Sequence, residues 1–238
     1  GLVEAHKTAA TFYREQLESP AAAAGRDFLK SRGFDASSAE HFGVGFAPQS
    51  WDALTGFLRG KGFTDEELLA GGLVSQGNRG VYDRFRGRLV WPIRDLGGDV
   101  VGFGARKLTD DDGPKYLNTP ETPIYKKSHV LYGIDLARRE ISKNQQAVIV
   151  EGYTDVMACH LAGVTTAVAT CGTAFGSDHI KVLRRLLMDD DRMKGQVVFT
   201  FDGDAAGQKA AMRAFAEDQK FVSQTFVAVE SHGLDPCD

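Results

Sequence analysis

From residue 146 onward the chain alternates short apolar runs with helical segments, and this alternation constrains the fold more than any other sequence feature. The apolar runs are rich in β-branched residues and too short to form helices. Strands buried on both faces have this composition, and strands alternating with helices form a mainly parallel sheet with right-handed crossovers. The sequence therefore predicts an α/β domain over residues 146–238, with strands near residues 147–151, 165–170, 196–202 and 224–230.

Acidic residues follow three of these four runs. Glu151 ends the first run, Asp202 and Asp204 follow the third, and Asp235 comes shortly after the fourth. Asp155 lies one helical turn after Glu151, close enough to share a site. Ligands of an open parallel sheet collect at the carboxyl ends of its strands, where converging carboxylates repel one another unless cations neutralise them. Because Mg²⁺ and Mn²⁺ prefer oxygen ligands, we predict a divalent-metal site at this edge.

Residues 1–145 have a different pattern, with helical segments first and strand-like segments after them. Helical segments with clear start and stop signals extend to about residue 75, including a capping box from Thr64 to Glu67. Strand-like segments then follow around a Gly97-Gly98 hairpin signal. We therefore predict a mixed α+β subdomain with a helical N-terminus over residues 1–145, followed by the α/β domain over residues 146–238.

Basic residues are concentrated between residues 84 and 127, where nine of them stand against six acidic residues. The arginines of the segment 84–88 alternate with other residues. On a strand, alternate side chains point to the same face, so we predict that Arg86 and Arg88 present one basic face. Such a face suits phosphate groups, because guanidinium groups bind them in a bidentate manner.

The overall composition sets limits on the class of protein. The hydrophobic fraction of 42% and the charged fraction of 25% are typical of a globular protein. The net charge of −4 does not by itself indicate a protein that binds nucleic acid. Three isolated cysteines, Cys159, Cys171 and Cys237, argue against a zinc site and a disulfide framework. With no long apolar run or signal-peptide pattern, we expect a cytoplasmic protein that has no membrane partner, and a fragment of a longer chain.

Several short motifs resemble the toprim domain that bacterial primases share with type IA and type II topoisomerases and some nucleases. These motifs are Glu151-Gly-Tyr-Thr-Asp155, Gly172-Thr173 and the acidic segment 202–207. The resemblance covers about residues 146–238 and implies a Rossmann-like fold with a metal-dependent phosphoryl-transfer site. It does not by itself specify the reaction.

A second resemblance, from about Tyr82 to Gly133, is to the polymerase domain of the bacterial DNA primase family. It is carried by the adjacent segments YDRFRGRLVWPIRD, GFGARKL and PKYLNTPETPIYKKSHVLYG. The resemblance implies synthesis of short RNA primers from ribonucleoside triphosphates on a single-stranded DNA template at replication forks. It also implies that a zinc-binding domain and a C-terminal domain that binds the replicative helicase lie outside this chain.

The family resemblance also suggests a role for each candidate residue. Glu151, Asp202 and Asp204 are expected to be catalytic and to hold a principal Mg²⁺ or Mn²⁺ ion, Asp235 to help bind a second ion, and Asp155 to support the site electrostatically. The expected nucleotide and template contacts are Arg86, Arg88, Lys115, Asn118 and Lys127. The family's last acidic motif commonly reads Asp-Pro-Asp, whereas this chain has Asp-Pro-Cys-Asp at residues 235–238, so Asp238 receives no role.

Three other functions use the same kind of domain. A topoisomerase would need a nucleophilic tyrosine in a separate domain, and a toprim nuclease would cut DNA without nucleotides. A DNA-binding adaptor would keep the fold with eroded acids, whereas the acids here are intact. Inhibition by an alarmone of the guanosine tetraphosphate type at the nucleotide site is also compatible with the basic face.

Overall fold

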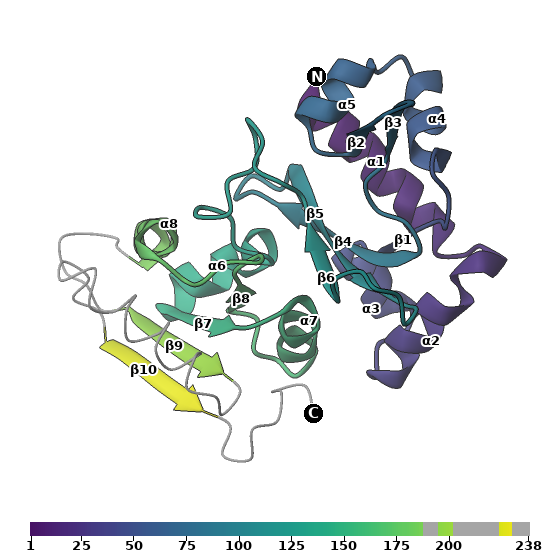
Figure 1. Cartoon of the computed structure of the whole chain (residues 1–238). Helices are drawn as coiled ribbons and strands as arrows, with labels where there is room; N and C mark the ends of the chain where they lie inside the picture. The colour runs from purple at the N-terminus through teal and green to yellow at the C-terminus, as the bar shows by residue number, and fades with distance from the viewer. Residues whose placement is uncertain (188–194, 202–223, 230–238) are drawn as a thin grey trace. The chain divides into compact units, whose positions relative to one another are not determined.

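The computed structural model describes residues 1–187 and 195–201, together with the strand at residues 224–229. The chain divides into two compact units (Figure 1). The first comprises Gly1–Ile93 and Asp99–Lys126, and the second comprises Arg94–Gly98 and the residues from Lys127 onward. Among the described helices, none combines the length and apolar character needed to cross a membrane.

Short helices make up much of the first unit, and local signals explain where they begin and end. Thr64 and Glu67 form the predicted capping box at the start of α5, with hydrogen bonds in both directions. Asp35 accepts a hydrogen bond of 2.8 Å from the amide of Ser38 at the start of α3. The helices are α1 (Leu2–Gln16), α2 (Ala23–Ser31), α3 (Ala36–Phe42), α4 (Ala53–Gly60) and α5 (Asp65–Ala70), and a 3-10 turn, Pro20–Ala22, precedes α2.

A four-stranded sheet and a separate hairpin complete the first unit. The sheet has the order β1-β4-β5-β6, with β1 antiparallel to β4 and β5 antiparallel to β6. The predicted strands around the Gly97-Gly98 turn are confirmed as β4 and β5. The strands of the sheet are β1 (Gly45–Ala47), β4 (Arg88–Arg94), β5 (Val100–Lys107) and β6 (Tyr116–Asn118), and the hairpin consists of β2 (Val74–Gly77) and β3 (Gly80–Asp83).

The core of the first unit lies between α1 and the sheet. Tyr13 of α1 contacts Phe103 of β5 edge-to-face, with 5.3 Å between the ring centroids. Gly45 of β1 permits the close approach of α1, because a Cβ atom there would lie 2.5 Å from the carbonyl carbon of Tyr13. The buried side chains of α4 and α5 extend the same core.

The predicted strand through residues 84–88 is wrong. β3 ends at Asp83 and β4 begins at Arg88, so the chain between them links the hairpin to the four-stranded sheet. The physical reason is Gly87, which has φ +62°, a left-handed conformation that a regular strand does not accept. Its amide donates to the carbonyl of Ala47 over 2.8 Å, which fixes the turn against β1. Arg86 and Arg88 therefore do not alternate along one strand.

The second unit is built around a parallel sheet with the order β10-β9-β7-β8, and all three neighbouring pairs are parallel (Figure 1). This confirms the predicted strand–helix series for the described residues. The helix predicted between the last two strands lies outside them. The elements are α6 (Ile134–Asn144), β7 (Gln146–Val150), α7 (Tyr153–Leu161), β8 (Ala167–Ala169), α8 (Ser177–Leu187), β9 (Gln196–Phe201) and β10 (Gln224–Val229).

Helix α6 packs into the core of the second unit. Ile134, Ala137 and Ile141 lie in one buried cluster with side chains of α8 and of the parallel sheet. The contacts thus place α6 with the sheet, whereas the sequence texture changes only after it, near residue 146. The domain division into residues 1–145 and 146–238 stays a prediction.

Candidate active site

The parallel sheet places the carboxyl ends of its four strands along one edge. β7 pairs with β9 so that Ile149 lies opposite Phe199, and β9 pairs with β10 over its whole length. The hydroxyl of Thr200 donates to the carbonyl of Ile149 over 3.1 Å and so ties β9 to β7 near this edge. Glu151 follows the last residue of β7 directly, and its side chain is exposed.

The other predicted metal ligands, Asp202, Asp204 and Asp235, lie outside the described residues. Asp202 follows directly after Phe201, the last residue of β9. The strand that leads to Asp202 is therefore the neighbour of the strand that leads to Glu151. This strand order is the one that the predicted site requires.

Asp155 lies in the first turn of α7 and is 2% exposed. Its carboxylate turns back toward the start of the helix, because a Cβ atom on Gly152 would lie 3.4 Å from its Oδ2 atom. The amino end of a helix carries partial positive charge, which favours a carboxylate there. Asp155 is therefore held at the start of α7, four residues after Glu151 in the sequence.

The chemistry of these side chains fits a hard divalent cation. Glu151 and Asp155 offer carboxylate oxygens, the ligand type that Mg²⁺ and Mn²⁺ prefer. Within residues 1–187 and 195–201, no group of three or more His, Cys, Asp or Glu side chains is close enough to hold a metal ion. The complete set would need the acids at 202, 204 and 235.

Arg86 lies in a layered cluster of side chains in the first unit. Its guanidinium carbon is 4.2 Å from the ring centroid of Trp51 and 5.4 Å from that of Tyr82. Its Nη1 atom donates to the carbonyl of Asp83 over 2.6 Å. The guanidinium is half-buried, so it is held in place while part of it still faces solvent.

Arg88 has a different environment, because its side chain is buried with only 7% exposed. Its Nη1 atom donates to the carbonyls of Ala105 and Lys115 over 3.4 and 3.3 Å. Burial lowers the pKa of the Arg88 guanidinium, the nearby carboxylate of Asp111 acts in the opposite direction, and the charge of Arg86 lowers it further. Arg88 therefore joins neighbouring segments of the first unit through backbone carbonyls.

The remaining predicted contacts are divided between the two units. Lys115 is exposed, and Asn118 is half-buried in β6. Arg84, which received no role from the sequence, donates to the carbonyl of Asn118 over 2.7 Å. Arg88 and Arg84 thus bind the backbone on either side of β6, at Lys115 and at Asn118. Lys127 belongs to the second unit, where its carbonyl is 2.8 Å from the Nε2 atom of His179.

Two features near Arg86 were missed by the sequence reasoning. Trp51 is 63% exposed, and Asp83 is buried with its carboxylate bonded to the start of α4. A tryptophan beside a helix start gives no periodic signal that separates an exposed ring from a buried one. Asp83 contacts residues almost thirty positions earlier, so local pattern could not reveal its role.

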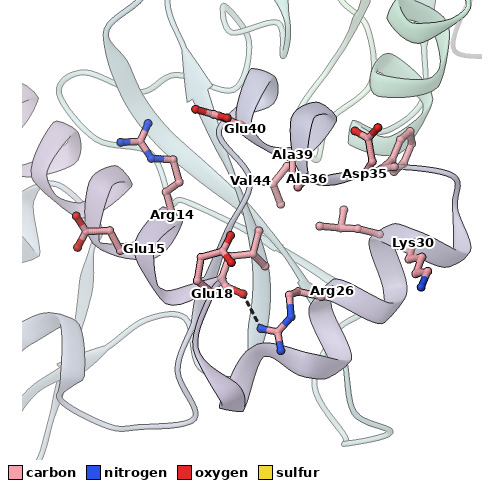
Figure 2. A pocket seen from close by; sticks show the side chains of 13 residues that line it. Arg14, Glu15, Glu18, Arg26, Lys30, Asp35, Ala36, Ala39, Glu40 and Val44 are labelled. Carbon is pink, nitrogen blue, oxygen red and sulfur yellow. Dashed lines mark hydrogen bonds between the residues drawn. The ribbon is translucent and has the colours of Figure 1, made fainter.

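A pocket of about 610 Å³ lies elsewhere in the first unit, between α1, α2 and α3. Figure 2 shows Arg14 and Glu15 on one side of it and Lys30 and Asp35 on the other. Arg26 donates to the carbonyls of Leu17 and Ser19. None of the predicted site residues lines this pocket, so it is not part of the predicted nucleotide site.

Comparison with protein families decides the classification. The family model for the DNA primase catalytic core, N-terminal domain, matches residues 12–138, and the model for the toprim domain matches residues 145–228. The chain belongs to the DNA primase family. The predicted combination of a primase core with a toprim fold is confirmed, and this toprim primase family is metal-dependent.

Individual relatives agree with this classification. A DNA primase of Streptomyces coelicolor is 70% identical over the whole chain, which spans 37% of that protein's length. The crystal structure of the RNA polymerase domain of Mycobacterium tuberculosis primase DnaG matches with a TM-score of 0.95 and 58% identity, over 100% of this chain and 77% of that one. The same domain in complex with a double-stranded DNA oligomer with a 6-nucleotide overhang matches with a TM-score of 0.93 and 58% identity, over 100% of this chain and 74% of that one.

Proposed function

We propose that this chain is the catalytic core of a DNA primase, which synthesises short RNA primers from ribonucleoside triphosphates on single-stranded DNA. The observation that carries the proposal is the strand order, in which β7 and β9 are neighbours and lead to Glu151 and Asp202. An acidic site at the carboxyl edge of a parallel sheet could serve several phosphoryl-transfer reactions. Because the chain belongs to the primase family, we favour nucleotidyl transfer.

In this proposal, Glu151, Asp202 and Asp204 hold a principal Mg²⁺ or Mn²⁺ ion and Asp235 helps hold a second. Two such ions, when bound, activate the primer 3′-hydroxyl and stabilise the leaving pyrophosphate. The exposed position of Glu151 suits direct ligation, whereas buried Asp155 suits support of the site. A carboxylate in the first turn of α7 interacts favourably with the partial positive charge of the helix amino end.

The basic residues of the first unit contact phosphates of the template or of the incoming nucleotide. Arg86 and Lys115 are solvent-accessible and carry this role directly. Arg88 acts mainly by holding β6, which carries Asn118 and follows Lys115. Lys127 contributes from the second unit. Because such binding rests largely on phosphate contacts, affinity for DNA should fall steeply with salt concentration.

The remaining partners are also part of the proposal. The relative from Mycobacterium tuberculosis was solved in complex with DNA that carries a single-stranded overhang, which supports a DNA template for this chain. We further propose that the replicative helicase binds through a C-terminal domain outside this region. Cytoplasmic action at replication forks and alarmone inhibition at the nucleotide site complete the proposal.

The test is template-directed RNA synthesis by this chain. A homopolymeric single-stranded DNA template, labelled ribonucleotides and Mn²⁺ or Mg²⁺ are incubated with the wild type or with Asp202→Asn, and the products are resolved by length. We expect incorporation only of the ribonucleotide complementary to the template, with loss of products in Asp202→Asn and in a chelator. DNA cleavage without nucleotides would support a nuclease instead. DNA binding with neither synthesis nor metal-dependent nucleotide binding would support an adaptor.

A further inference from the structure

A buried histidine in the first turn of α8 makes two hydrogen bonds to backbone groups of other segments. His179 is 1% exposed. Its Nδ1 atom accepts from the amide of Gly176 over 3.0 Å, and its Nε2 atom lies 2.8 Å from the carbonyl oxygen of Lys127, 52 residues earlier. Burial lowers the pKa of the imidazole, so the ring is uncharged at neutral pH and its one hydrogen lies on Nε2. His179 therefore donates to the backbone of a predicted nucleotide or template contact.

The imidazole is also the last of three buried rings that begin on the parallel sheet. Phe199 of β9 contacts Phe175 edge-to-face, with 5.1 Å between the ring centroids. Phe175 in turn stacks on the imidazole of His179 at 5.5 Å, with 22° between the ring planes. All three side chains are at most 6% exposed, and close packing leaves such side chains little room to move. The three rings therefore fix His179 relative to β9, the strand that leads to Asp202.

A second contact between the Lys127 segment and α8 is weaker. The Nε2 atom of His129 lies 3.9 Å from the Oδ2 atom of Asp178, and the two side chains are 53% and 38% exposed. Exposed pairs at such a distance contribute little to stability, and this one is charged only when the imidazole is protonated. The bond from His179 is buried, and breaking it leaves a polar group without a partner. We therefore expect His179 to provide most of the restraint on the backbone at Lys127.

We infer that His179 is a positioning residue for Lys127, and that it holds this lysine in place to contact the triphosphate of the incoming ribonucleotide. The three rings link His179 to the strand that leads to the predicted metal ligands, whose ions bind the triphosphate in the proposed mechanism. A lysine has a flexible stem, and it loses less entropy on binding a phosphate when its backbone is already fixed. The inference rests on the proposed function, because it assigns a support to one of the nucleotide contacts.

Two substitutions separate the two hydrogen bonds of the imidazole. The side-chain amide of glutamine reaches about as far as Nε2 and can donate to the carbonyl of Lys127, whereas the shorter asparagine reaches only as far as Nδ1 and can accept from Gly176. We therefore expect His179→Gln to retain the positioning of Lys127 and His179→Asn to lose it. His160→Asn is the matched control, because the Nε2 atom of His160 also lies close to a backbone carbonyl, 2.9 Å from that of Ala167 in β8. It should leave nucleotide affinity unchanged.

The deciding experiment measures binding of mant-GTP, a fluorescent ribonucleoside triphosphate, by anisotropy in the presence of Mn²⁺. His179→Asn should weaken binding by about 2- to 10-fold, the factor for one hydrogen bond, and His179→Gln by less than about 2-fold. Lys127→Ala should weaken binding by about 10- to 100-fold, because it removes a bond between charged groups. Adding His179→Asn to Lys127→Ala should cause no further loss, because His179 acts through the lysine side chain that is then absent.

If His179 served only to stabilise the fold, His179→Gln and His179→Asn would weaken binding equally, and the loss from His179→Asn would be the same with and without Lys127. Either result would overturn the inference, as would unchanged binding by Lys127→Ala. Primer synthesis on the same samples tests the proposed function separately. Binding of mant-GTP without synthesis would contradict primase activity, while the comparison of the His179 variants would still decide the inference. If the wild type neither bound mant-GTP nor made primers, both proposals would be wrong.

Discussion

The acidic edge of the second unit and the basic residues of the first unit differ in how their side chains are placed. Glu151 is placed locally, because it follows a strand of a parallel sheet and therefore lies at the edge where ligands collect. Arg86 is placed by contacts with Tyr82 and Asp83 of the preceding strand and with Trp51, which comes from a distant segment of the chain. The comparison shows that strand order alone can position a metal site, whereas a phosphate-binding surface built on linking segments depends on long-range packing.

Arg86 and Arg88 make the same point within one segment. They stand two residues apart, and the sequence predicts equal roles for them on one face. The turn at Gly87 separates them, so that Arg86 stacks at the surface while Arg88 is buried against backbone carbonyls. Two arginines of the same motif can therefore have different roles. We expect Arg86 to contact nucleic acid and Arg88 to stabilise the fold.

The largest expected effect is at the acidic edge. Glu151→Gln keeps the size of the side chain but removes the negative charge that a metal ligand needs. Even residues that only orient metal ligands contribute about 10- to 100-fold, so we expect primer synthesis to fall by about 100-fold or more. Primer yield per unit time measures the effect. Glu140→Gln, the same change on α6, is the control and should retain activity.

The second-largest effect is expected from removing the buried carboxylate of Asp83. This change tests how much long-range contacts contribute to the stability of the first unit. Asp83→Ala removes three hydrogen bonds to α4. We expect it to lower the free energy of unfolding by about 3 kcal/mol, because bonds to charged groups are among the stronger ones. Urea denaturation measures the loss, and hydrogen exchange at Leu54 and Thr55 locates it. Asp52→Ala is the matched control, because Asp52 precedes α4 without a side-chain cap bond. An equal loss in both variants would contradict the assigned role.

A smaller effect separates the two arginines. Arg88→Met keeps an apolar stem of similar length but removes the buried guanidinium, and we expect a loss of about 1 kcal/mol in unfolding free energy. Arg86→Ala should change unfolding little and weaken DNA binding instead. Urea denaturation and DNA anisotropy on both variants measure the two properties. If Arg88→Met weakened DNA binding with unchanged stability, Arg88 would be a direct phosphate contact.

The smallest effect is a pH dependence in the second unit. Burial lowers the pKa of the His179 imidazole from its ordinary value of 6.5. Its Nδ1 atom accepts from the amide of Gly176 over 3.0 Å, so Nε2 carries the hydrogen and donates to the carbonyl of Lys127. The unfolded chain then binds a proton more readily than the folded one. The stabilising contribution is complete above pH 6.5 and is lost as the pH falls toward the folded pKa.

We therefore expect the free energy of unfolding to decrease below pH 6.5, with a contribution from His179 of at most about 1.4 kcal/mol per pH unit. His179→Gln should flatten this slope, as measured by urea denaturation across the pH range. The same comparison at about pH 8, where the imidazole is neutral in both states, isolates the cost of the altered hydrogen bonds. A variant with the wild-type slope would rule out this source of pH dependence. His6, whose pKa is also lowered by burial, acts in the same direction.

The features that the sequence predicted correctly are those with local causes. The capping box at Thr64, the hairpin at Gly97-Gly98 and the parallel strand series depend on short-range spacing and on apolar periodicity. The strand expected through residues 84–88 failed because Gly87 adopts a left-handed turn that alternation of residue types does not reveal. Trp51 was missed because its backbone is bonded to Asp83, a contact between distant residues that local pattern does not reveal.

The central claim is that the second unit binds the metal ions and the first unit binds DNA. It is tested most directly by Mn²⁺ titration calorimetry on the wild type, Glu151→Gln and Arg86→Ala, with DNA affinity measured on the same samples. We predict that Glu151→Gln weakens Mn²⁺ binding by about 10-fold or more and leaves binding of single-stranded DNA nearly unchanged. Arg86→Ala should show the opposite pattern. Wild-type Mn²⁺ binding by Glu151→Gln would contradict the metal site at the edge of the parallel sheet.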